Sequence, residues 1–194
     1  RVAAFVFLFI FFLGMSTELF IRSGMIVPGD AAATVKNIAA SEALFRLSLV
    51  SDLIRQVLLM VLHLVLYKLL KPVNKDIASL MVIFALASVP ISMLNELNHF
   101  AVLLLSSNTG YKTAFNADQL NALMMFFLEL RKYGTYIPQV LSIWVLLLGY
   151  LVFKSDFLPR IFGFLLMLGG LCYTVSAVLF FLFPNFDATI FGLF

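Results

Sequence analysis

Long apolar runs, separated by short charged segments, dominate the chain. Several runs contain about 20 residues, the length that an α-helix needs to cross the ~30 Å hydrocarbon core of a bilayer. They predict five transmembrane helices, at about residues 2–21, 41–70, 77–105, 133–153 and 161–183. Because the connections are short, neighbouring helices are expected to be antiparallel. The predicted fold class is an all-α, polytopic transmembrane helical bundle.

The segments between the spans carry signals for short interfacial helices in the outer loops. Asp30 is placed to cap a short alanine-rich helix after the first span. Residues 116–132 are also expected to form a helix, capped by Asn116 or Asp118. We expect that helix to lie along the membrane interface before Gly134 bends the chain.

Composition strengthens the membrane assignment and excludes other classes. The chain has 194 residues, of which 63% are hydrophobic and only 12% charged, and this excludes a water-soluble domain. The net charge is +3, but the basic residues are scattered, so nucleic-acid binding is not expected. The single cysteine, Cys172, excludes an intrachain disulfide and a cysteine-based metal cage. We find no hydrolase, P-loop or dinucleotide motif, so we predict no cofactor and lean against an enzyme.

The basic residues of the tight loops predict an orientation in the cell membrane. Cytoplasmic loops carry an excess of Lys and Arg, and this places the N-terminus in the cytoplasm. We expect one domain over residues 1–194, C-terminally truncated, with a sixth span beyond its end. The residues expected on the cytoplasmic side are Arg1, Lys68, Lys71, Lys75, Lys154 and Arg160.

The second span is unusual because Arg46, Asp52 and Arg55 interrupt it. Its apolar residues contribute about −7 kcal/mol to insertion, against about +9 kcal/mol for three deep charges. The charges should therefore face the bundle interior, and each has a candidate partner on its own helix: Glu42 with Arg46, and Asp52 with Arg55. Three interpretations remain open: a locked ion-pair network, a functional cavity, or an Arg46 side chain that extends to the interface.

Polar residues also form stripes on consecutive helices. Asp52, Gln56 and His63 share one face of the second span. In the third span, the sequence NELNH at residues 95–99 indicates a wet pocket, to which Glu18 could contribute. Glu96 and His99 also form one E-x-x-H pair, but a di-iron site needs a second pair, so we assign no metal ligand and no catalytic residue. The candidate ligand-binding residues are Glu18, Arg46, Asp52, Arg55, Gln56, Asn95, Glu96 and His99.

Three strings resemble a bacterial family of multi-pass membrane proteins known as domain of unknown function 4386. They are LFIRSGMIVPGDAAATVKNIAASEALFRLSLVSDLI at 19–54, YKLLKPVN at 67–74 and LLLGYLVFKSDFLPRIFGFLLMLGGLCY at 146–173. The resemblance implies six spans and a bacterial inner-membrane location. It implies no activity, cofactor or catalytic residue.

Three functions are open on this basis. The first is binding or transport of a small anionic solute or lipid head group through an outward-facing polar cavity, with membrane lipids as partners. The second is a non-catalytic structural or accessory subunit, forming a homo- or hetero-oligomer through the small-residue face of Gly163 and Gly170. The third is a metal-dependent intramembrane enzyme.

Overall fold

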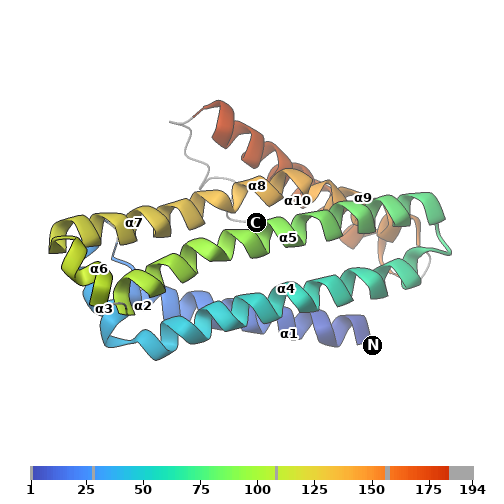
Figure 1. The fold of residues 1–194 in the computed structure, drawn as a ribbon. Helices are drawn as coiled ribbons and strands as arrows, with labels where there is room; N and C mark the ends of the chain where they lie inside the picture. The colour runs from blue at the N-terminus through green and yellow to red at the C-terminus, as the bar shows by residue number, and fades with distance from the viewer. Residues whose placement is uncertain (1, 28, 108, 156–157, 184–194) are drawn as a thin grey trace. The chain divides into compact units, whose positions relative to one another are not determined.

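The regular elements of the described chain are helices (Figure 1). A computed structural model describes residues 2–27, 29–107, 109–155 and 158–183. Five helical runs are long and apolar enough to cross a membrane, which confirms an all-α bundle with five spans. The expected sixth span and the tail at 184–194 lie outside the described residues. The five runs are Phe5–Met25, Glu42–Leu70, Lys75–Ser107, Ala117–Lys154 and Arg160–Leu182.

The first run changes its helix type along its length. Helix α1 (Val2–Ser16) continues as the π-helix η1 (Thr17–Arg22) and then as α2 (Ser23–Met25). The predicted alanine-rich helix is α3 (Ala31–Ala40), and the Asp30 carboxylate accepts a hydrogen bond from the backbone N–H of Ala33 at 2.8 Å. The predicted cap is therefore confirmed.

The second and third runs are single helices, α4 (Glu42–Leu70) and α5 (Lys75–Ser107). Both lie within two residues of their predicted bounds at each end. The Asn74 side chain accepts hydrogen bonds from the N–H groups of Asp76 and Ile77, so it starts α5 sharply after the turn. With 33 residues, α5 is about 50 Å long, more than a bilayer core requires.

The fourth run differs from the prediction, because it begins at Ala117 rather than near residue 133. It comprises α7 (Ala117–Gly134), α8 (Tyr136–Gln139), the 3₁₀ turn η2 (Val140–Ser142) and α9 (Ile143–Lys154). Asn116 caps α7 as predicted. However, α7 buries an apolar stripe of Leu120, Met124 and Leu128 in a helical core, so its amphipathic pattern reflects packing against other helices.

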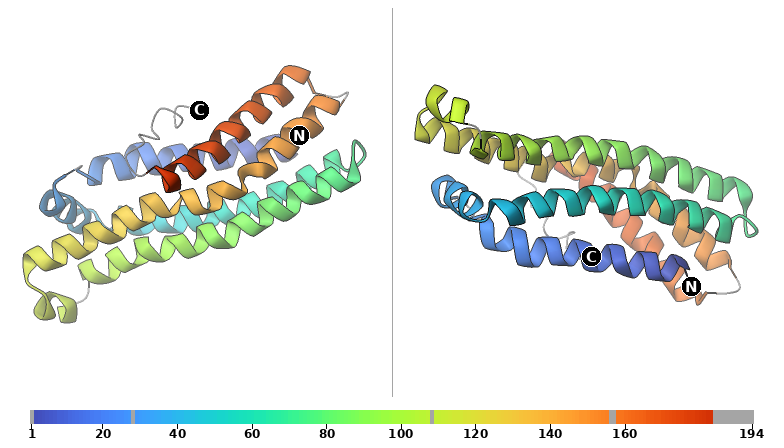
Figure 2. Two further views of the ribbon diagram at one scale, coloured as in Figure 1. Left: turned by 90° about the horizontal axis from the view of Figure 1, so that it is seen from above. Right: turned by 60° about the horizontal axis from the view of Figure 1, so that its bottom comes forward.

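Two compact units divide the described chain. The first unit comprises residues 1–58 and 93–134, and its core joins α2, α3, α4, α5 and α7. In this unit α7 runs beside the C-terminal part of α5 (Figure 2). The short helix α6 (Thr109–Ala114) connects these two elements. Both α4 and α5 continue into the second unit, so neither unit is a separate stretch of chain.

The second unit comprises residues 59–92 and 135–194, and its core includes Leu70, Met81 and Leu151. Within it, α10 (Arg160–Leu182) packs closely on α9. A Cβ at Gly163 would lie 2.5 Å from the backbone nitrogen of Phe153, so the helices approach this closely only because a glycine is there. Gly170 lies against α9 in the same way. Oligomerisation through this glycine face stays a prediction, and a partner would have to displace α9 to use it.

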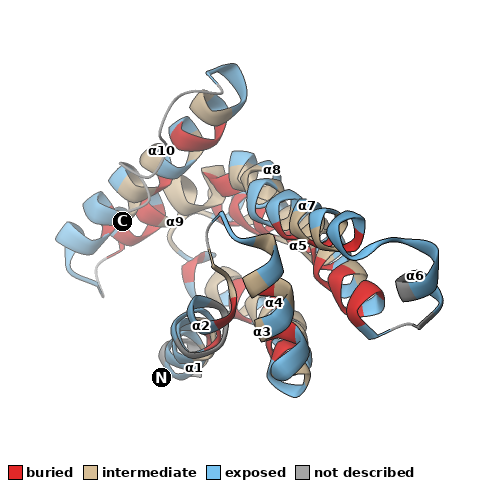
Figure 3. Ribbon diagram, turned by 90° about the vertical axis from the view of Figure 1, so that its left-hand side faces the viewer, coloured by how far each residue is buried: buried red, intermediate tan, exposed pale blue. Residues whose placement is uncertain are grey.

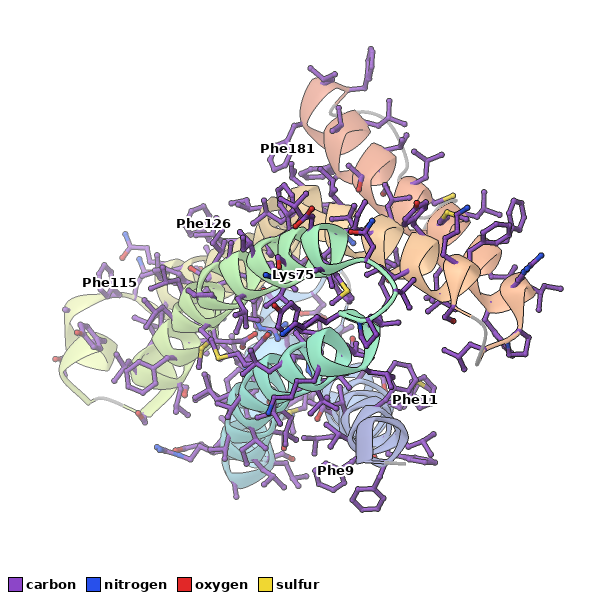
Figure 4. All side chains as sticks on the ribbon, turned by 90° about the vertical axis from the view of Figure 1, so that its right-hand side faces the viewer. Phe9, Phe11, Lys75, Phe115, Phe126 and Phe181 are labelled. Atoms are coloured by element: carbon purple, nitrogen blue, oxygen red, sulfur yellow. The ribbon has the colours of Figure 1, made fainter. Side chains whose placement is uncertain are left out.

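Burial is inverted relative to a water-soluble protein. Large apolar side chains cover the outside, and Phe9, Phe11, Phe126 and Phe181 project away from their helices (Figure 4). The buried positions of α4 form a narrow stripe along the helix, and Figure 3 shows buried segments beside exposed ones on the long helices. Polar residues of α4 occupy that stripe, whereas one apolar series of α4 is between 44% and 53% exposed. That series is Leu44, Leu47, Val50, Ile54, Val57, Val61 and Leu64.

Candidate functional site

Three helices of the first unit bring opposite charges together. Arg131 of α7 donates to both carboxylate oxygens of Glu96 on α5, from Nε to Oε2 and from Nη2 to Oε1, each at 3.1 Å. Its Nη2 also lies 3.0 Å from Oδ2 of Asp52 on α4. A guanidinium that grips one carboxylate with two parallel bonds fixes its orientation as well as its distance. Arg131 of α7 therefore links α4 and α5 to α7 at the depth of Asp52 and Glu96.

Backbone contacts hold Arg131 in place. The side-chain amide of Asn95 donates a 2.8 Å hydrogen bond to the carbonyl oxygen of Arg131 and accepts one of 3.0 Å from Asn98. This contact also requires Gly134, because a Cβ there would collide with the Asn95 amide. The NELNH segment, for which the sequence predicts a wet pocket, thus also joins α5 to α7 through Asn95.

His99 joins the same group from the next turn of α5. Its Nδ1 lies 3.4 Å from Glu96 Oε2, and its Nε2 lies 3.4 Å from the hydroxyl oxygen of Ser48 on α4. The Phe45 ring packs edge-on against the imidazole at 4.2 Å. His99 is 1% exposed, so its ring is fixed by packing as well as by polar contacts. We call Asp52, Arg55, Glu96, His99 and Arg131 the ion cluster.

The ion cluster lies deep in the span. Asp52 is about 6 Å along the axis from the midpoint of α4. Asp52 is 2% exposed and Glu96 6%, so both carboxylates are removed from solvent. Two carboxylates and two arginines make the cluster neutral when His99 is neutral, which is the condition for burying charge in a low-dielectric region.

Arg55 is the least satisfied member of the cluster. Among the described residues, its hydrogen bond runs from Nη2 to Asp52 Oδ1 and is 3.4 Å long. Its Nε is buried and has no hydrogen-bond partner among the described residues. The side chain as a whole is 29% exposed and passes close to Gly14 of α1. A guanidinium has five N–H donors, and the hydrogen bond to Asp52 uses one of them.

Apart from Asn95, three predicted site residues are not members of the ion cluster. Arg46 is exposed and bonds to Glu42 at 2.6 Å, which confirms that predicted pair and makes it an isolated surface contact. Glu18 is an exposed residue of the π-helix. Gln56 is buried one turn beyond Asp52 on α4. The structure therefore brings together Asp52, Arg55, Asn95, Glu96 and His99 of the predicted residues.

Arg131 is absent from the residues predicted for the site, because its partners Asp52 and Glu96 lie on other helices. One signal could have indicated it: Glu96 has no Lys or Arg one turn away on its own helix. Three members of the cluster could also hold a metal ion, since one ligand atom each from Asp52, Glu96 and His99 lies within 4.8 Å of the others.

His63 is a second buried histidine, in the other unit. It is 2% exposed, and neither ring nitrogen has a hydrogen-bond partner among the described residues. Its ring meets that of Trp144 edge-on at 4.5 Å. The predicted stripe of Asp52, Gln56 and His63 is thus buried along α4, but only Asp52 takes part in the ion cluster.

Five long apolar helices, an apolar exterior and a buried, charge-balanced cluster define a multi-pass helical membrane protein. Within that class, the chain belongs to the family described as domain of unknown function (DUF4386), whose model matches residues 2–194. No curated protein and no solved structure matches the chain.

Proposed function

We propose that this protein binds an anionic group within its membrane-spanning helices, as the binding step of transport. The group is a phosphate or carboxylate, carried by a small solute or by a lipid head group. The observation that supports this most directly is the state of Arg55, which has one long hydrogen bond and a buried Nε without a partner among the described residues.

The other arginines near the cluster do not offer this capacity. Arg131 gives three hydrogen bonds to two carboxylates, and Arg46 is paired with Glu42. An arginine deep in a membrane is costly unless it is paired or reaches water. A phosphate or carboxylate accepts two parallel N–H bonds from a guanidinium, so such a group would satisfy the donors that Arg55 leaves open.

The contact with Asp52 suggests how the ligand would be released. Asp52 Oδ1 is 3.4 Å from Arg55, while its other oxygen is held by Arg131 at 3.0 Å. An incoming anion competes with Oδ1 for Arg55, and Asp52 keeps Arg131 as its counter-ion during the exchange. When the anion leaves, Asp52 takes up Arg55 again. In the bound state Asp52 and Glu96 share Arg131, and the cluster carries the net negative charge of the ligand.

The test compares two arginines of one helix. Purified protein in phosphatidylcholine nanodiscs is titrated with inorganic phosphate, and in a second arm the nanodiscs contain phosphatidic acid. Loss of charge-assisted bonds worth about 1.5–3 kcal/mol should weaken binding about 10- to 150-fold in Arg55→Gln. Arg46→Gln, the matched control, should bind like the wild type.

The two arms identify the source of the anion. Saturable binding of inorganic phosphate indicates a free solute, whereas retention of phosphatidic acid alone indicates a lipid head group. Equal binding by wild type and Arg55→Gln in both arms would refute the proposal.

A second candidate is a purely structural role, favoured by the pairing of Arg131 with both Asp52 and Glu96. In that case the cluster fixes the register of three helices and binds nothing. Thermal unfolding separates the two candidates. A structural role predicts that Arg55→Gln destabilises the protein as much as Arg131→Gln does, whereas a binding role leaves the Arg55 variant close to the wild type.

A further inference from the structure

We propose that Asp52, Glu96 and His99 form a binding site for a divalent transition-metal cation of the zinc type. Their ligand atoms lie within 4.8 Å of one another, and all three side chains are buried. Imidazole nitrogen and carboxylate oxygen are a ligand set that zinc accepts. The sequence argued against metal because a di-iron site needs two E-x-x-H pairs, but one ion needs only this pair and a carboxylate from another helix.

The distance between His99 and Glu96 matches the separation of two ligand atoms on one metal ion. Nδ1 and Oε2 are 3.4 Å apart, beyond the usual range of about 2.7–3.2 Å for N–H···O bonds. Two atoms bound tetrahedrally to one zinc at about 2.1 Å lie about 3.4 Å from each other. Asp52 would need to move inward by up to about 1.5 Å to complete the set.

The hydrogen bonds around His99 also support a metal ligand at Nδ1. The Ser48 hydroxyl donates its proton to the carbonyl oxygen of Phe45 at 2.8 Å. The Ser48 oxygen can then contact His99 Nε2 only as an acceptor, so Nε2 carries a proton. In the neutral ring Nδ1 therefore presents a lone pair towards Glu96 Oε2, where a metal cation would be bound by both atoms; in the protonated ring Nδ1 donates to Glu96 instead. Metal-binding histidines commonly have this arrangement, with the second nitrogen donating to a neighbouring oxygen.

Arg131 is compatible with the ion, because each carboxylate oxygen has two lone pairs and Arg131 takes one. The charge of the metal ion must also be balanced. A divalent ion would leave the neutral cluster with two positive charges, and a dianion at Arg55 would restore neutrality. In this respect the inference rests on the proposed function, since it predicts that zinc and a dianion bind better together than alone.

The chain contains two histidines, so His63 provides a matched control. Metal-free protein in detergent is titrated with zinc by calorimetry, with and without sulfate, a dianion that does not precipitate zinc. The wild type and His63→Gln should bind about one zinc per chain, and His99→Gln should bind at least about tenfold more weakly. Sulfate should tighten zinc binding in the wild type but not in Arg55→Gln.

Each result decides between alternatives. Absence of zinc binding by the wild type, or equal loss in His63→Gln and His99→Gln, would overturn the metal site. Zinc binding that depends on His99 but not on sulfate would support the metal site and count against anion binding at Arg55. If His99→Gln does not fold, Ser48→Ala keeps all three ligands and should weaken zinc binding about tenfold, and an unchanged affinity would contradict the inference.

Discussion

Replacement of Arg131 by Gln is the most direct test of the ion cluster. The change removes three hydrogen bonds of 3.0–3.1 Å to Asp52 and Glu96. Both carboxylates stay buried, and they lose the closest guanidinium contacts that the structure shows for them. Breaking a buried ion pair from one side costs about 3–5 kcal/mol. At about 2–4 °C per kcal/mol for a chain of this size, Tm should fall by at least about 6 °C.

The assay is thermal unfolding in detergent, followed by far-UV circular dichroism and gel filtration. Lys132→Gln is the neighbouring control, because Lys132 is exposed, and it should change Tm by less than about 2 °C. The double variant Arg131→Gln/Glu96→Gln removes one charge of each sign and should recover at least about 1 kcal/mol relative to the sum of the single changes. Strictly additive losses would refute the reasoning, as would an Arg131→Gln protein as stable as the wild type.

Other contacts give independent expectations for thermal unfolding. Gly149→Ala should destabilise the α9–α10 pair by about 1–3 kcal/mol, because its Cβ would lie 2.6 Å from a backbone nitrogen of α10. Gly169→Ala, on the open side of α10, should instead be neutral or stabilising by up to about 1 kcal/mol, and equal losses in the two variants would contradict the packing. Asp30→Ala should cost about 1 kcal/mol through loss of the α3 cap, measurable as a lower Tm. Arg46→Gln should cost less than about 1 kcal/mol, because its pair with Glu42 is exposed, and a larger loss would show that the pair is part of a buried network.

The inverted burial pattern follows from the solvent. In lipid, an exposed leucine costs nothing, whereas an exposed charge loses its hydration. In α4 one apolar series faces outward, and the polar residues Ser48, Asp52, Gln56 and His63 are buried. The same physics explains why removal of the Arg131 charge should be more damaging than removal at an exposed position such as Arg46.

The elements were predictable to the extent that local rules control them. Asp30 and Asn116 cap helices as their spacing indicated, and both α4 and α5 follow their apolar runs. The start of the fourth run was not predictable, because an amphipathic helix with one polar face is equally suited to the membrane interface and to packing against other helices. Burial of Leu120 in the first unit decided between these alternatives.

The contacts of the candidate site also fall into a predictable and an unpredictable group. Pairs on one helix, such as Glu42 with Arg46 and Asp52 with Arg55, follow from the helical period alone. The partnership of Glu96 with Arg131 joins residues 35 positions apart, and no local rule relates them. Apolar runs alone therefore establish that the chain is a helical membrane protein and that its few charges must be paired. Which charges meet depends on how the helices pack, because side-chain partners on different helices are chosen by distance in three dimensions.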